Sequence, residues 1–262
     1  MDPELYENHL AILKSELIVA LGCTEPIAIA FAAAKAREVL GQMPERCVVR
    51  CSGNIIKNVK GVVVPKSQGM RGMDAAAALG IVGGDDSQEL AVLESVTEED
   101  VKTVRRLLAQ DFCTCELAEG VENLYILISV SAQGHSAEVE IKDYHNHITK
   151  IKKDGAVLYA KDEQSETETA KNGDKSLLSL KNILEFADCV RMEDIEETIG
   201  RQIAYNTAIS EEGLKDPWGA QVGRTLVENS REEDIKVIAA AAAAAGSDAR
   251  MSGCSLPVSY TH

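Results

Sequence analysis

Cys23 is the residue of this chain best placed to do chemistry. It follows Gly22 and precedes Thr24, Glu25 and Pro26, and a proline at this place is typical of the first turn of a helix. The unpaired N–H groups at a helix start favour a thiolate, and such positions lower the pKa of a cysteine. The sequence therefore predicts a reactive thiol beside the Glu25 carboxylate. A cysteine packed as a small apolar residue is an equally consistent interpretation.

A second cysteine, Cys254, lies between Gly253 and Ser255 in a loop that also contains Pro257. A loop of small residues lets the backbone approach an iron–sulfur cluster and direct N–H groups at its sulfides. The alternative is a loop thiol without a role, because a cysteine without C-x-x-C spacing is a weak indication of a metal site. The other five cysteines are expected in the protein core: Cys47, Cys51, Cys113, Cys115 and Cys189.

Polar groups at three further places could bind a substrate. His145 and His147 are two residues apart near an expected strand start, which would point both imidazoles in one direction. A pair of exposed turn histidines is the alternative, and the spacing alone slightly favours it. Two turns also carry groups suited to a carboxylate or another polar ligand, with a plain turn as the alternative: Ser52, Gly53, Asn54 and Asn58 in one, and Gly69 in the other.

Helices and strands must position these residues. Apolar spacing predicts helices over residues 5–21, 26–40, 74–79 and 98–110, the last started by a capping box at Thr97. Alternation predicts strands over 46–52 and 55–65, then a meander of short strands between 112 and 161. Helices are expected again over 177–190, 194–209 and 232–245, where Gly246 would end the last. The predicted fold class is α+β: N-terminal helices with a mainly antiparallel sheet, followed by an all-helical region.

Composition sets the domain organisation and excludes some partners. Residues 162–175 are polar and acidic, and are expected to link a domain over residues 1–161 to a helical domain over 176–262.

The 262 residues include 27 Lys and Arg against 42 Asp and Glu, a net charge of −15. This charge argues against nucleic acid and against an anionic membrane surface as partners. Without a basic leader or an apolar stretch of ~20 residues, a cytoplasmic protein is expected.

Read together, the motifs resemble those of the L-cysteine desulfidase family, which is similar to the α chain of iron–sulfur L-serine dehydratases. The resemblance covers nearly the whole chain and is carried by four segments in order: residues 22–26, 52–59, 65–72 and 252–257. It implies an oxygen-sensitive [4Fe–4S] cluster held by three cysteines, whose open iron acts as a Lewis acid on a small amino acid. L-cysteine would then be degraded to pyruvate, ammonia and sulfide by α,β-elimination.

By the same resemblance, Cys23 is the family's essential N-terminal cysteine, a base or exchangeable ligand, and Cys254 is the first of three cluster ligands. Family members carry the other two beyond the Gly-Cys-Ser-Leu-Pro loop, so a C-terminally truncated chain with an incomplete cluster-binding domain is expected. The expected partners are a small amino-acid substrate and a second copy in a homodimer. The alternatives are an L-serine dehydratase-type deaminase and an inactive truncated homologue that binds no cluster.

Overall fold

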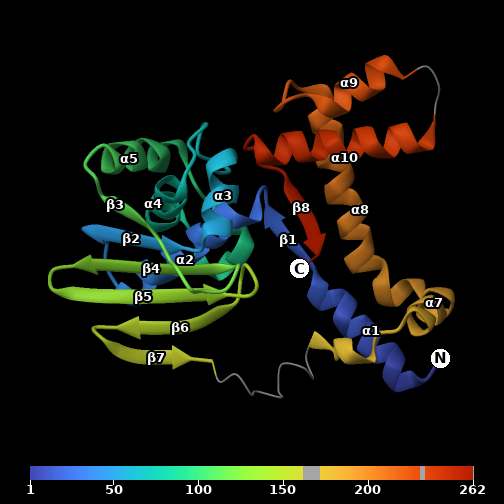
Figure 1. The fold of residues 1–262 in the computed structure, drawn as a ribbon, viewed down its shortest axis with the longest axis horizontal. Coiled ribbons are helices and arrows are strands. Elements are labelled where there is room, and N and C mark those ends of the chain that lie inside the picture. Colours follow the sequence, from blue (N-terminus) through green and yellow to red (C-terminus); the bar gives the residue numbers. More distant parts are fainter. Residues whose placement is uncertain (162–171, 231–233, 262) are drawn as a thin grey trace.

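The computed structural model describes residues 1–161, 172–230 and 234–261, which form a mixed α+β structure (Figure 1). The helices are α1 (Pro3–Glu16), α2 (Thr24–Leu40), α3 (Gly53–Gly61), α4 (Met73–Gly83), α5 (Glu98–Leu108), α7 (Leu180–Cys189), α8 (Met192–Lys215), α9 (Val222–Asn229) and α10 (Ile235–Met251). Short 3₁₀ helices span Asp86–Ala91 and Lys175–Leu177. The strands are β1 (Leu17–Leu21), β2 (Arg46–Cys51), β3 (Cys113–Leu117), β4 (Tyr125–Ala132), β5 (His135–Lys142), β6 (Ile148–Lys153), β7 (Ala156–Ala160) and β8 (Pro257–Thr261). The predicted α+β class, with a mainly antiparallel sheet followed by helices, is confirmed.

A six-stranded sheet in the order β3-β2-β4-β5-β6-β7 forms the middle of the chain. Strands β2 and β3 run parallel, and the other neighbouring pairs run antiparallel. In β4, every second side chain from Ile126 to Ala132 is buried, as expected for a sheet with one covered face. Gly134 and Gly155 take positive φ values in the tight turns from β4 to β5 and from β6 to β7. The predicted meander is therefore confirmed.

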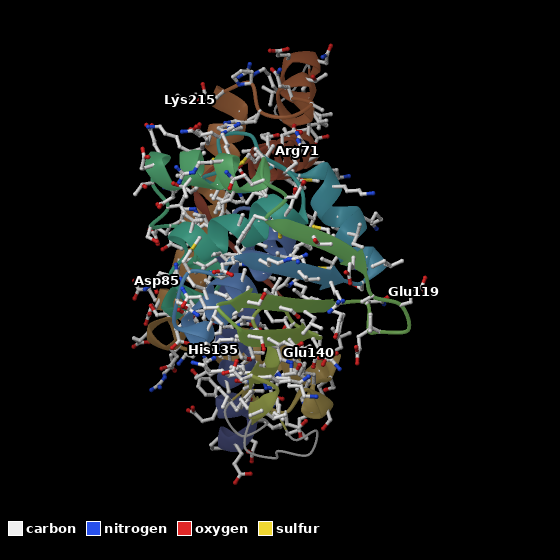
Figure 2. All side chains as sticks on the ribbon, turned by 90° about the vertical axis from the view of Figure 1, so that its left-hand side faces the viewer. Arg71, Asp85, Glu119, His135, Glu140 and Lys215 are labelled. Atoms are coloured by element: carbon white, nitrogen blue, oxygen red, sulfur yellow. The ribbon has the colours of Figure 1, made fainter. Side chains whose placement is uncertain are left out.

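Helix α2 is central to the fold and lies against the buried face of this sheet, with α4 packed on it (Figure 1). Residues 27–34 of α2 are at most 5% exposed, because the helix is apolar on all sides. Gly80 of α4 allows the close approach of the two helices, since a Cβ there would lie 2.1 Å from the carbonyl oxygen of Ala30. The other face of the sheet is polar, and Figure 2 shows Glu140 on it.

The helices after residue 176 pack mainly through α8 and α10, which cross each other closely (Figure 1). Small residues make the crossing close: a Cβ at Gly213 would lie 2.0 Å from the carbonyl oxygen of Ala245. Strand β8 returns from these helices and pairs antiparallel with β1, with Leu21 opposite Pro257. Because α2 begins just after β1, this pairing brings the loop that precedes β8 next to the start of α2. Among the helices in the described part of the chain, none has the length and apolar character needed to cross a membrane.

Three predicted elements are wrong in part. Residues 17–21 form a strand rather than the end of the first helix, because they pair with β8 from the far end of the chain, Leu17 with Thr261. Residues 55–61, expected in a strand over 55–65, lie in α3 instead, because Ile55 and Val59 are buried at helical spacing and Ser52 caps the helix. Helix α10 continues through Gly246 to Met251, since the glycine packs against α8.

The expected linker is described only in part, because residues 162–171 lie outside the described residues. Its last residues are anchored on α1: Asn8 Nδ2 donates to the Asp174 carbonyl oxygen at 3.1 Å, and Lys175 Nζ lies 2.6 Å from Glu16 Oε1. Helix α1 also lies beside α7 and α8 (Figure 1). The first helix therefore packs with the C-terminal helices, while the boundaries at 161 and 176 stay predictions.

Candidate active site

The turn between β1 and α2 brings three distant segments together. Gly22 has a φ of +69°, and a Cβ there would lie 2.6 Å from Pro65 Cγ and 3.5 Å from the carbonyl oxygen of Cys254. Cys23 follows as the N-cap residue of α2, and its side chain makes no capping hydrogen bond. Only a glycine fits between the α2 start, the loop at Pro65 and the loop at Cys254, so these three motifs form one site.

The carboxylate of Glu25 is the centre of the hydrogen bonds at this site. Its Oε2 accepts from Cys23 Sγ and from Thr24 Oγ1, each at 3.2 Å, and its Oε1 accepts from Asn58 Nδ2 of α3 at 2.9 Å. Burial by itself would raise the pKa of Glu25, but these hydrogen bonds and the nearby His145 imidazole hold that pKa below its usual value. The structure thus gathers three of the predicted site residues, Cys23, Asn58 and His145, around the ionised carboxylate of a fourth, Glu25.

The Cys23 thiol is protonated here, which corrects the prediction of a lowered pKa. The residue is 8% exposed. Burial and then the negative charge of Glu25 raise the pKa of Cys23 to about 12, and the Arg250 guanidinium acts weakly in the opposite direction. The helix start does not dominate, because desolvation and an adjacent carboxylate both disfavour a thiolate. Cys23 can become a base only after passing its proton on, and Glu25 Oε2 is the acceptor within reach.

Cys254 lies in the loop between α10 and β8, whose backbone is fixed beside the Cys23 turn. The Val63 N–H donates to the Met251 carbonyl oxygen at 2.9 Å, and a Cβ at Gly253 would lie 2.6 Å from Val63 Cγ1. Cys254 itself is 4% exposed. Its side chain belongs to a small apolar cluster with Ile209, Ala249 and Val258.

The environment of Cys254 suits one thiolate ligand, but not a complete cluster site. Burial raises the pKa of its thiol, while backbone hydrogen bonds from Leu256 and Ser255 act to lower it, as N–H groups directed at a ligating sulfur would. Within residues 1–161, 172–230 and 234–261, however, no group of three or more His, Cys, Asp or Glu side chains is arranged to hold a metal ion. The described residues therefore do not form the ligand set of a [4Fe–4S] cluster by themselves.

The remaining cysteines lie away from this site. Cys47 and Cys51 are buried in β2, as predicted. Cys113 is half-buried and Cys115 exposed, because β3 is the edge strand of the sheet, and Cys189 is exposed at the end of α7. The prediction that all five pack in the core is therefore wrong for Cys115 and Cys189, whereas Cys113 packs against the core with part of its side chain exposed.

The predicted residues at the start of α3 have structural partners. The Ser52 hydroxyl donates to the Asn123 carbonyl oxygen at 2.6 Å and caps the helix at the Ile55 N–H. Gly53 and Asn54 form the exposed first turn of α3. Of this motif, Asn58 reaches Glu25, so the substrate-binding role of the other three stays a prediction.

The two histidines face different neighbours, because they lie in a turn before β6 and not on a strand. His145 is near Glu25. His147 instead has its Nδ1 3.0 Å from the Lys142 carbonyl oxygen and its Nε2 2.7 Å from Lys161 Nζ. The strand geometry behind the prediction of two parallel imidazoles is absent here, so their common direction and the role of His147 in binding both stay predictions.

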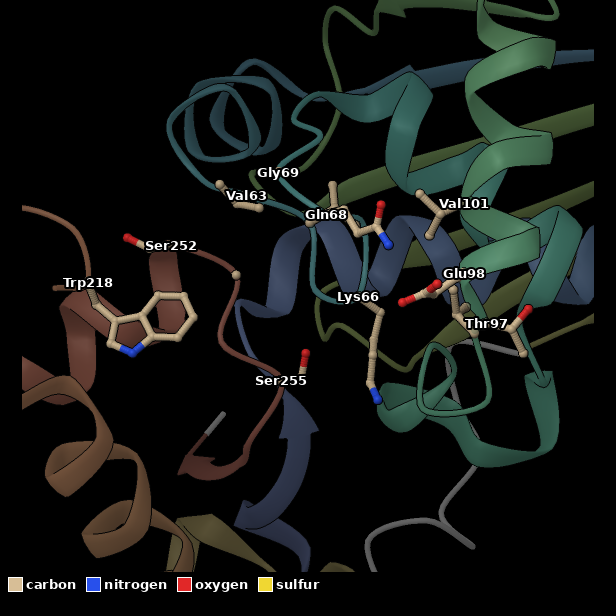
Figure 3. Close-up of a pocket in the computed structure, with 13 residues that line it drawn as sticks. Val63, Lys66, Gln68, Gly69, Thr97, Glu98, Val101, Trp218, Ser252 and Ser255 are labelled. Atoms are coloured by element: carbon tan, nitrogen blue, oxygen red, sulfur yellow. The ribbon is translucent and has the colours of Figure 1, made fainter. Parts of the chain in front are cut away.

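Gly69 lies in a cavity of about 470 Å³ beside the Cys254 loop (Figure 3). One wall consists of the loop at residues 63–69 and the start of α5, and the other of Trp218 with Ser252, Gly253 and Ser255. Gly253 and Ser255, the two chain neighbours of Cys254, therefore both line the cavity. Its position predicts access of a small molecule to the 252–255 loop.

Arg250 also belongs to the site, although no sequence motif indicated it. Its charge acts on the Cys23 thiol, and its buried Nε has no hydrogen-bond partner in the described part of the chain. A buried unpaired donor is costly, so it indicates a place for an acceptor. The sequence carried no signal for it, because the helix was expected to end at Gly246, four residues earlier.

Comparisons with known proteins agree with this combination of segments. The profile of the serine dehydratase alpha chain family matches residues 87–261. Similar curated proteins are the UPF0597 proteins of Lachnoclostridium phytofermentans, 47% identical over 254 residues, of Finegoldia magna, 48% over 253, and of Treponema denticola, 39% over 262. These alignments cover 97%, 96% and 98% of this chain and 60%, 60% and 61% of the respective relative, so the chain spans about 60% of their length. The comparison with solved structures gave no match. The chain belongs to the serine dehydratase alpha chain family.

Proposed function

We propose that this chain is part of an iron–sulfur-dependent lyase that degrades L-cysteine to pyruvate, ammonia and sulfide. Family membership supports a lyase that acts on a small β-substituted amino acid. The observation that carries the proposal is the meeting of the Cys23 turn, Asn58 of α3 and the Cys254 loop at one place, with Gly22 between them.

The reaction is an α,β-elimination. The α-C–H bond and the β-C–S bond of L-cysteine break, the sulfur leaves as sulfide, and the resulting 2-aminoacrylate is hydrolysed to pyruvate and ammonium. Removal of the weakly acidic α-proton needs a base in a water-poor site. Cys23 is that base: transfer of its proton to Glu25 Oε2, 3.2 Å away, leaves a thiolate whose charge the Arg250 guanidinium offsets.

Two further side chains keep Glu25 ready for this transfer. The Asn58 amide holds Oε1 at 2.9 Å, which fixes the orientation of the carboxylate. His145 lies near enough to keep it ionised, so that Oε2 carries no proton before the transfer. In this assignment Asn58 and His145 are positioning residues, and Cys23 with Glu25 forms the catalytic pair.

A [4Fe–4S] cluster, as used by iron–sulfur serine dehydratases, would supply a Lewis acid for the β-substituent. Cys254 is the residue of this chain that we assign as one of its ligands, because its thiol is buried beside backbone N–H groups. The other ligands of such a cluster are not among the described residues, which contain no group of three or more metal-ligating side chains.

L-serine is the second candidate substrate, because the matching family is described as the serine dehydratase alpha chain. The test is to incubate the whole lyase that contains this chain anaerobically with iron and sulfide, and to measure iron-dependent absorbance and pyruvate from each amino acid. Pyruvate with stoichiometric sulfide from L-cysteine supports the proposal, and pyruvate from L-serine alone assigns the chain to deaminases. Neither absorbance nor pyruvate would identify an inactive homologue and overturn the proposal.

A further inference from the structure

The cavity between the two parts of the molecule carries one positive and one negative side chain. Lys66 and Glu98 both line it, and neither side chain has a hydrogen bond or ion pair within the described residues. Figure 3 shows both side chains on the same wall, with Trp218 and Ser255 opposite. A cavity that presents separate cationic and anionic groups to the same space is complementary to a zwitterion.

The Lys66 wall is rigid and conformationally unusual. Lys66 and Gln68 have positive φ values of 61° and 55°, which non-glycine residues rarely adopt. Ser67 between them is 1% exposed and donates from its hydroxyl to the Met70 carbonyl oxygen at 3.2 Å. Arg105 of α5 donates to the Gln68 carbonyl oxygen at 2.9 Å. Strain of this kind is retained where it positions side chains for binding, and both strained residues line the cavity.

The opposite wall is equally fixed. The Trp218 indole N–H donates to Glu212 Oε1 at 3.3 Å. Asp248 accepts from the N–H groups of Ala220 and Val222 at 3.2 and 2.8 Å, which holds the turn that carries the indole. An apolar ring beside Ser252 and Ser255 offers a surface for a short side chain, next to Cys254.

We propose that this cavity is the α-amino-acid subsite, in which Lys66 binds the carboxylate and Glu98 the ammonium group, with Trp218 limiting the side chain. The volume of about 470 Å³ accommodates a small amino acid with water. The choice of amino acids over other zwitterions rests on the proposed lyase function. The recognition of both charges rests on the cavity itself.

Intrinsic fluorescence can report binding directly, because Trp218 is the only tryptophan of the sequence. The ligand is L-alanine, which has no β leaving group and so binds without turnover. We expect a saturable fluorescence change with L-alanine and a much weaker one with propionate or ethylamine, each of which has one charge. Loss of an ionic hydrogen bond should weaken L-alanine binding by about tenfold or more in Lys66→Gln and in Glu98→Gln.

Exposed residues outside the cavity provide matched controls, Lys57→Gln on α3 and Glu94→Gln before α5, which should bind like the wild type. No saturable response to L-alanine, or equal affinities in Lys66→Gln, Glu98→Gln and the two controls, would overturn the subsite. A response to propionate equal to that of L-alanine would overturn the role of Glu98. L-alanine binding without any pyruvate from L-cysteine or L-serine would instead reject the proposed function and leave the subsite standing.

Discussion

Replacing Glu25 by glutamine should make the Cys23 thiol more acidic. At pH 8, a thiol with a pKa of about 12 is ionised in only about one molecule in 10⁴. Burial remains in Glu25→Gln, but the negative charge next to Sγ is removed, so the pKa falls from about 12 toward the usual 9. Each unit by which the pKa of Cys23 falls corresponds to about 1.4 kcal/mol and raises the thiolate population about tenfold.

The rate of Cys23 alkylation by iodoacetamide, followed peptide by peptide in a mass spectrometer, measures this population. We expect at least an approximately tenfold faster reaction at pH 8 in Glu25→Gln, with the midpoint of the pH profile moved to lower pH. Cys47, 1% exposed in β2, is an internal control for loosening of the fold, and exposed Glu45→Gln is the control substitution. An unchanged Cys23 rate, or an equal acceleration at Cys47, would refute the assigned coupling between Cys23 and Glu25.

Three predictions concern stability, each measured by urea unfolding. The first concerns pH: the folded Cys23 keeps its proton up to pH about 12, whereas the unfolded thiol loses it above pH 9. The free energy of unfolding of wild type should therefore fall by about 1.4 kcal/mol per pH unit, relative to Cys23→Ala, between pH 9 and 11. Equal slopes in the two proteins would contradict the raised pKa. Gly80→Ala should destabilise the protein by about 1–3 kcal/mol or more, because its Cβ would clash with the Ala30 carbonyl oxygen. Gly200→Ala in α8 is the control and should stabilise the protein by about 0.5–1 kcal/mol, since no atom lies near its Cβ position. A neutral Gly80→Ala would contradict the close packing of α2 and α4. Thr97→Ala removes the capping box of α5 and should lower the free energy of unfolding by about 1 kcal/mol, whereas Thr97→Ser keeps the capping hydroxyl and is the control; equal effects would argue against the cap.

Local patterns predicted those elements whose geometry is set by local residues. The β-meander follows from alternation and glycine turns, and α5 from the capping box of Thr97 and Asp100, which the structure confirms. The buried α2 follows from its uniformly apolar sequence. In each case the residues that determine the element lie within it, so the sequence is sufficient.

The errors arose where a distant segment decides the structure. Residues 17–21 pair with β8, and Gly246 stays helical because it packs on Ser210 of α8, neither of which is visible from neighbouring residues. The same holds for the site. Cys23, Glu25 and Cys254 could be singled out by their motifs, but Arg250 and Lys66 could not, because their importance comes from long-range contacts. The raised pKa of Cys23 likewise depends on burial, which a motif does not reveal.

The most direct test is pyruvate formation from L-cysteine by the lyase that contains this chain, loaded with iron anaerobically, and by its cysteine variants. We expect pyruvate and sulfide in equal amounts from wild type and from Cys189→Ser, whose thiol is exposed on α7, with loss of both products in Cys23→Ser at unchanged iron content. Pyruvate formation by Cys23→Ser at the wild-type rate would contradict the assignment of Cys23 and Glu25 as the catalytic pair.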